Sequence, residues 1–222
     1  MFSRCGAFLR SSIGKKASMA VTGLLLIGFL VVHVIGNLTL FADGDGSAFN
    51  AYAHKLESLG PLKIVAEVVL GVLFLVHLGL GMRTAMENRE ARPKRYKDLA
   101  AKGARSPASM TMLVTGVVIL VFLVIHIIDF RLADFSKQGL AALVIERLSS
   151  PLGAGIYFVA MLFLASHLGH AFQSLFQTLG LRHPSYTPAI KTVGIAIAVL
   201  VAGLFAVFPV ACMLFEGRWP WS

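Results

Sequence analysis

Five apolar stretches, each long enough to cross a lipid bilayer, constrain the fold of this chain more than any other feature. A hydrocarbon core of about 30 Å requires about 20 residues of α-helix at 1.5 Å per residue. Of the 222 residues, 57% are hydrophobic and only 14% are charged, which is typical of a membrane protein rather than of a soluble domain. We predict membrane spans at residues 19–41, 62–82, 110–130, 153–176 and 193–215.

The spans predict an all-α fold, in which residues 1–222 form a single domain built as an integral membrane bundle of five transmembrane helices. A membrane β-barrel would need alternating segments of about 10 residues, and the sequence has none. The first span is too long for the apolar part of a signal peptide and contains His33. We therefore expect it to be retained as a helix of the bundle.

The distribution of basic residues predicts the orientation of the bundle. Fourteen Lys and Arg residues lie on the side of the N-terminus, and six lie on the other side. Because cytoplasmic loops carry the excess of positive charge, we expect a cytoplasmic N-terminus and an external C-terminus. This topology, facing anionic lipid or an acidic subunit, accounts for the net charge of +9 without a nucleic-acid partner.

Four of the seven histidines lie inside four different spans, 14 to 16 residues after the predicted start of each. Ionisable side chains are costly in hydrocarbon, so an intramembrane histidine is a candidate functional residue. A single histidine of this kind is equally consistent with a buried residue that only forms hydrogen bonds. The matched positions of all four favour a shared function. The four are His33, His77, His126 and His167.

The alternating direction of the spans places these histidines at two depths. His33 and His126 are predicted in the outer half of the membrane, and His77 and His167 in the inner half. Two pairs at two depths are what two haems with two histidine ligands each require in a core formed by the first four helices. A single metal ion would need all four at one depth. His170 has a similar depth to His167, and spacing alone leaves the fourth ligand open between them.

Small residues accompany these histidines. The tripeptide His-Leu-Gly begins at both His77 and His167, and Gly28 and Gly36 flank His33. Glycine beside a ligand would let a porphyrin edge approach the helix backbone. Glycine also serves plain helix–helix packing in membranes, so this observation alone does not separate the two roles.

Short motifs follow one another in a specific order around the four histidines. They are Gly-Asn-Leu at 36–38, Phe-Asn-Ala-Tyr at 49–52, Ala-Arg-Pro at 91–93 and His-Leu-Gly-His-Ala-Phe-Gln-Ser at 167–174. On these motifs the chain resembles the B-type membrane anchor of succinate:quinone oxidoreductases (succinate dehydrogenase or quinol:fumarate reductase). That anchor is a five-helix, di-haem cytochrome b subunit. The resemblance covers nearly the whole chain and favours His167 as the fourth ligand.

The resemblance implies an electron relay and its partners. Two b haems would pass electrons between a membrane quinone, menaquinone rather than ubiquinone, and an iron–sulfur subunit that carries the FAD-containing flavoprotein. The chain would be the quinone-reactive subunit of the enzyme, in the cytoplasmic membrane of a bacterium or archaeon. It contains no G-x-G-x-x-G or C-x-x-C motif, so the dicarboxylate chemistry would belong to its partners. The basic segment 83–105 is the expected docking surface.

Glu67 is the candidate for proton exchange with the quinone. It precedes the midpoint of the second span, at the predicted level of His33 and His126. Burial at that depth would favour a neutral carboxyl group suited to exchanging protons. The alternative is an interfacial glutamate whose side chain extends outward to the membrane surface or bonds Asn50 or Tyr52 of the preceding loop.

Three smaller features complete the predictions from sequence. Asp129 lies three residues after His126 and is expected to join a propionate network, conduct protons or pair with Arg131. Residues 140–148 predict a short amphipathic helix. Trp219 and Trp221 predict an aromatic belt at the outer membrane surface.

Two other functions remain open from the sequence. One is the di-haem cytochrome b anchor of a different respiratory enzyme, such as a formate dehydrogenase, hydrogenase or nitrate reductase. The other is a haem-free proton channel that uses the histidines as a relay.

Overall fold

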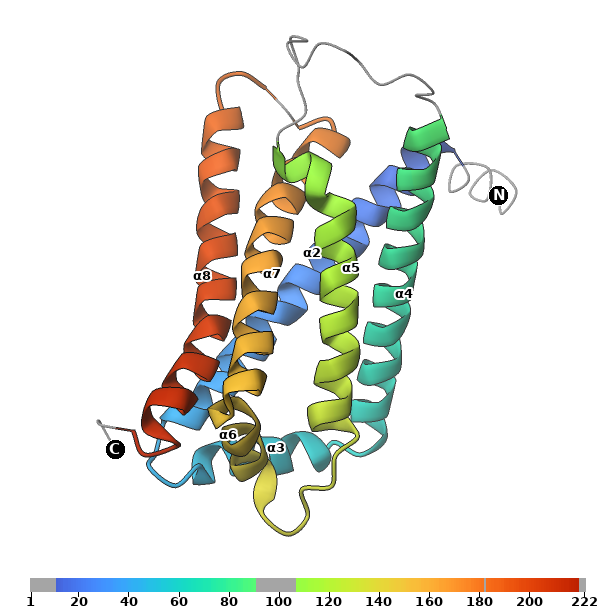
Figure 1. Ribbon diagram of the computed structural model, residues 1–222. Coiled ribbons are helices and arrows are strands. Elements are labelled where there is room, and N and C mark those ends of the chain that lie inside the picture. Colours follow the sequence, from blue (N-terminus) through green and yellow to red (C-terminus); the bar gives the residue numbers. More distant parts are fainter. Residues whose placement is uncertain (1–10, 91–106, 182, 220–222) are drawn as a thin grey trace.

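Every regular element in the described part of the chain is helical (Figure 1). The computed structural model describes residues 11–90, 107–181 and 183–219. The elements are α2 (Ser12–Asn37), η1 (Leu38–Phe41), α3 (Ser47–Glu57), α4 (Pro61–Glu90), α5 (Pro107–His126), η2 (Ile127–Arg131), α6 (Gly139–Ser149), α7 (Pro151–Thr178) and α8 (Thr187–Phe215).

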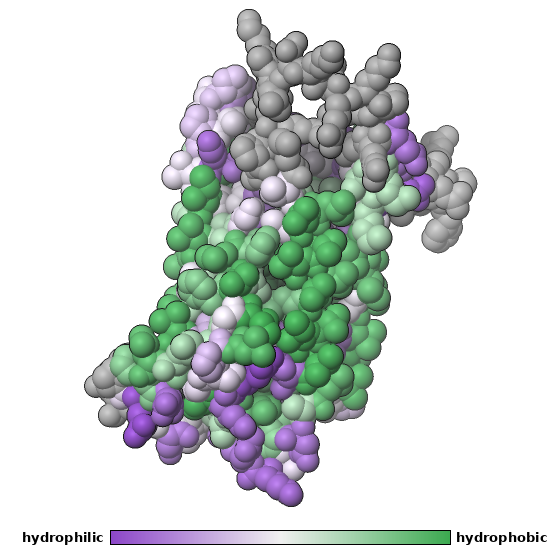
Figure 2. All heavy atoms as spheres, in the orientation of Figure 1, coloured by the Kyte–Doolittle hydropathy of each residue, from purple (hydrophilic) through white to green (hydrophobic). Residues whose placement is uncertain are grey.

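The predicted all-α membrane bundle is confirmed, because α2, α4, α5, α7 and α8 are each long and apolar enough to cross a membrane. The helices begin before the predicted spans where a polar side chain caps them. The Ser11 hydroxyl accepts a hydrogen bond from the Gly14 amide at 3.0 Å, and the Ser150 hydroxyl accepts one from the Gly153 amide at 3.1 Å. A broad apolar band separates the polar groups at the two ends of the bundle (Figure 2).

The packed apolar core lies on one side of the bundle, where α7 and α8 run side by side and α2 crosses behind them (Figure 1). In the most apolar stretch of α7 and of α8, 39% of the residues are buried, compared with 6% in α5 and none in α4. The fifth span therefore contributes as much to the core as α7 does. By contrast, α4 and α5 present most of their apolar surface outward.

Two short helices, α3 and α6, cover one end of the bundle, which we call the α3–α6 end (Figure 1). The Asp43 carboxylate accepts hydrogen bonds from the Ala48 amide at 2.5 Å and the Ser47 hydroxyl at 2.8 Å at the start of α3. These bonds lower the pKa of Asp43. The helix predicted at residues 140–148 is confirmed as α6, and Asn50 ties it to α3 by accepting from the Ala141 amide at 3.0 Å.

Trp219 lies inside the protein and not in a belt at its surface, so that prediction is wrong for this residue. Its side chain is part of the core, with only 3% of the residue exposed. The indole nitrogen donates a hydrogen bond to the Leu40 carbonyl at 3.0 Å. This bond joins the segment after α8 to η1, the short helix after α2. Trp221 lies outside the described residues.

Two glycines in the first turns of α7 provide a matched test of this packing. A Cβ atom on Gly153 would overlap the Arg147 backbone oxygen, whereas one on Gly155 would meet nothing within 4 Å. Gly153→Ala should therefore lower the free energy of unfolding by about 1–3 kcal/mol. Gly155→Ala should raise it by up to about 1 kcal/mol through helix propensity. Thermal unfolding of both variants in detergent measures the difference, and equal melting temperatures would contradict the packing described.

Candidate functional site

His33 and His126 face each other near the α3–α6 end. His33 lies on α2, His126 ends α5, and their ring centroids are 5.8 Å apart with an angle of 86° between the ring planes. Aromatic side chains surround the two rings. These are Phe29, Phe122, Phe130, Tyr157 and Phe205. The structure thus brings together the two histidines that the sequence assigns to the outer level.

His77 and His167 form the second pair, on α4 and α7, and lie within electrostatic range of each other. Each ring is bonded to a threonine on the preceding transmembrane helix. The Nδ1 atom of His77 lies 3.2 Å from the Thr22 hydroxyl and 3.2 Å from the Met19 carbonyl. The Nδ1 atom of His167 lies 3.1 Å from the Thr115 hydroxyl.

The hydrogen bonds of the threonines determine which ring nitrogen carries the proton. The Thr22 hydroxyl has carbonyl acceptors on its own helix, Ser18 at 2.9 Å and Met19 at 3.1 Å, and Thr115 donates to the Met112 carbonyl at 3.0 Å. A hydroxyl has one hydrogen, so each threonine oxygen accepts from the histidine Nδ1–H. The Nε2 atoms therefore carry the free lone pairs. Within the described residues nothing hydrogen-bonds to either Nε2.

The sequence reasoning missed these two threonines, although a repeat marks them. Val-Thr-Gly occurs at 21–23 and again at 114–116, and each threonine precedes a span histidine, His33 or His126, by 11 residues. The glycine after each threonine leaves room for the opposite imidazole. A Cβ atom on Gly23 would lie 3.1 Å from Cε1 of His77, and one on Gly116 would lie 3.7 Å from Cε1 of His167. The same threonine–histidine contact therefore occurs in the α2–α4 and the α5–α7 helix pair.

The glycines near the histidines serve different purposes. A Cβ atom on Gly36 would overlap the Tyr52 hydroxyl, and one on Gly169 would contact the Ala198 methyl group at 3.6 Å. Gly36 therefore allows close packing with α3, whereas a side chain at position 169 would make only an ordinary contact with α8. A Cβ atom on Gly28 or Gly79 would meet nothing within 4 Å, and both glycines are exposed.

The remaining span histidine, His170, lies one turn beyond His167 on α7 and is partly buried. No hydrogen bond joins it to any other described residue. Because His167 is the residue that reaches Thr115, the geometry favours His167 over His170 as the partner of His77. His54 and His183 are exposed.

The spacing of His33 and His126 fits a bis-histidine haem. Two metal–imidazole bonds of about 2 Å would place the ring centres about 6 Å apart, close to the 5.8 Å between His33 and His126. The Nδ1 atom of His126 is buried without a hydrogen-bond partner among the described residues. No three metal-ligating side chains cluster in the described ranges, and a haem iron takes only two ligands from the protein.

A π-helical turn, η2, follows His126 and directs two charged side chains in different directions. Asp129 accepts hydrogen bonds from Arg147 at 2.8 Å and from the Tyr157 hydroxyl at 2.9 Å. Arg131 instead binds Glu67 on α4. Of the three alternatives for Asp129, the pair with Arg131 is therefore wrong. Such turns are frequent at functional sites because they change the register of a helix.

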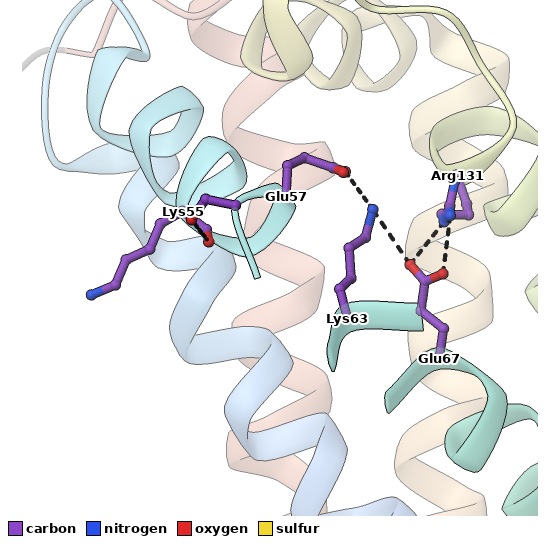
Figure 3. A network of polar contacts seen from close by, with 6 residues as sticks. Lys55, Glu57, Lys63, Glu67 and Arg131 are labelled. Carbon is purple, nitrogen blue, oxygen red and sulfur yellow. Dashed lines mark hydrogen bonds and ion pairs between the residues drawn. The ribbon is translucent and has the colours of Figure 1, made fainter. Parts of the chain in front are cut away.

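Glu67 belongs to a chain of ion pairs at the α3–α6 end (Figure 3). Its two oxygens accept from Nε and Nη2 of Arg131 at 2.9 and 3.0 Å, and Lys63 lies 3.6 Å away. Lys63 also bonds Glu57 at 2.5 Å. The Glu67 side chain is 37% exposed, as in the alternative of an outward-extending glutamate, and its partners are Arg131 and Lys63 rather than Asn50 or Tyr52.

Comparisons with family models, with curated proteins and with solved structures give no match.

Of the basic segment 83–105 that is predicted to dock a partner, residues 91–105 lie outside the described residues. At its beginning, Arg83 bonds Glu87 at 3.1 Å. Glu87 also accepts a hydrogen bond from the buried Lys15 of α2. The Lys15–Glu87 bond joins α2 and α4 at the end where α2 begins.

The Asp129 network provides a test of the site's framework. Asp129 and Arg147 are largely buried, with side-chain exposures of 15% and 28%. Asp129→Asn should reduce the free energy of unfolding by about 1–3 kcal/mol, because Arg147 would keep its charge without a carboxylate partner. Glu216→Gln, which breaks the exposed pair with Arg218, is the matched control and should change the melting temperature little. Equal effects of the two substitutions would contradict a structural role for the Asp129 network.

Proposed function

We propose that this chain is the membrane-anchor cytochrome b of a succinate:quinone oxidoreductase, holding two b haems with two histidines each. The observation that carries the proposal is the presence of two histidine pairs at two levels of one helix bundle. Thr22, beside His77, precedes His33 by 11 residues on α2, which corresponds to about 16 Å along the helix. Two separated pairs suit a relay better than a single metal centre.

In this proposal His33 and His126 would hold one haem, and His77 and His167 the other. When bound, the haems would supply one-electron transfer, and bis-histidine ligation would leave the iron no open position for oxygen chemistry. The protein's own contribution is to hold the two pairs at a fixed separation. It also surrounds the imidazoles with apolar and aromatic side chains that exclude water.

The sequence motifs add the partners and the topology to the proposal. The N-terminal side would face the cytoplasm of a bacterium or archaeon and would bind the iron–sulfur subunit, which carries the flavoprotein. The α3–α6 end would face outward. A quinone, menaquinone in preference to ubiquinone, would exchange protons with Glu67, whose carboxylate lies at the partly exposed α3–α6 end.

A reduced-minus-oxidised spectrum with a pyridine haemochrome assay tests the central proposal. The purified protein should contain two b haems per chain. His33→Ala or His126→Ala should remove one haem, and His77→Ala or His167→Ala should remove the other, because a single remaining ligand holds haem weakly.

His170→Ala and His54→Ala are the matched controls for this experiment, and both variants should retain two haems. A wild-type protein without haem would overturn the proposal. Loss of a haem in His170→Ala with full retention in His167→Ala would transfer the ligand role to His170.

The proposed role of Glu67 predicts a separable effect. Glu67→Gln should lower the quinol-dependent activity of the assembled complex by at least tenfold while both haems remain, because an amide cannot exchange the proton. Glu57→Gln removes the neighbouring carboxylate that shares Lys63 and should leave the activity near the wild-type value. Equal activities of the two variants would exclude Glu67 from proton exchange.

A further inference from the structure

The two histidines of the inner pair have the same support, although they belong to different helices. His77 and His167 each donate Nδ1–H to a threonine hydroxyl from the preceding transmembrane helix. Each threonine is held in turn by the carbonyl oxygens of its own helix. The hydroxyl oxygen therefore points its lone pair at the imidazole.

We infer that Thr22 and Thr115 are positioning residues that fix the tautomer of His77 and His167 and tune the haem that these two histidines would hold. The inference rests on the proposed function. A hydrogen bond accepted from the distal ring nitrogen orients a metal-ligating imidazole and raises its basicity. A more basic ligand stabilises ferric iron relative to ferrous iron and so lowers the midpoint potential.

His77 and His167 differ in the number of groups that accept a hydrogen bond from Nδ1–H. This difference predicts effects of different size for the two threonines. His77 has a second acceptor, the Met19 carbonyl at 3.2 Å, whereas Thr115 is the only group among the described residues that accepts from His167. Removing the Thr115 hydroxyl would therefore leave a buried N–H without a partner. Removing the Thr22 hydroxyl would leave the bond to Met19.

The outer pair lacks this arrangement. His126 Nδ1 has no hydrogen-bond partner among the described residues, and His33 lies 3.4 Å from the Asn37 side-chain amide through Nε2. Substitutions at the two threonines should therefore affect one haem and leave the other unchanged. This selectivity distinguishes an effect on the ligands from a general loosening of the bundle.

The test is a redox titration of the visible spectrum of the purified membrane protein, together with the low-spin ferric signals in electron paramagnetic resonance. Thr115→Val should raise one of the two midpoint potentials and shift one of the two signals. A tenfold change in the ferric–ferrous equilibrium corresponds to about 59 mV for a one-electron couple. Thr22→Val should shift the same haem by a smaller amount, and Thr115→Ser should restore the wild-type potential.

Thr192→Val is the matched control, because Thr192 also donates to a carbonyl of its own helix, Pro188 at 3.1 Å, and is exposed. It should leave both potentials unchanged. If Thr115→Val loses one haem that Thr115→Ser retains, the hydroxyl is required and the inference stands.

Two results would overturn the inference alone. One is a pair of valine variants with two haems at wild-type potentials. The other is a Thr115→Ser variant that behaves like Thr115→Val, because the methyl group and not the hydroxyl would then matter. A wild-type protein that binds no haem would instead overturn the proposed function, and the inference with it.

Discussion

A buried N–H group in an apolar helix bundle needs a hydrogen-bond acceptor, and this requirement explains the arrangement around His77 and His167. An unsatisfied buried N–H costs about 1–3 kcal/mol, a large share of a typical stability. Thr22 and Thr115 meet the requirement for His77 and His167. They leave one nitrogen with a free lone pair on each ring, which is the state that a metal ligand needs.

The threonine–histidine hydrogen bond occurs twice because the chain contains two helix pairs with the same sequence motifs. Val-Thr-Gly and a histidine 11 residues after the threonine occur on both α2 and α5, and His-Leu-Gly occurs on both α4 and α7. Parallel repeats of this kind are common in membrane proteins, and they place binding sites between the repeats. The helix outside the repeat, α8, supplies packing instead, through its contact with α7.

The sequence predicted the features that follow from regular helices. Hydrophobic length identified the five spans, and the position of each histidine along its span predicted that His33 would meet His126. The polar contacts near the helix ends were harder to predict, because they depend on irregular backbone conformations. The π-helical turn after His126 changes the register of Asp129 and Arg131, so their partners became Arg147 and Glu67. Trp219 became buried because the chain after α8 folds back onto η1.

The location of each threonine has a consequence for how the protein would be assembled. Thr22 and His77 belong to one helical hairpin, and Thr115 and His167 belong to the next. Each imidazole can therefore be oriented as soon as its own hairpin has entered the membrane, before the two hairpins meet. When the two hairpins pack together, two imidazoles that are already oriented would meet. The proposed haem between them would then link the two hairpins.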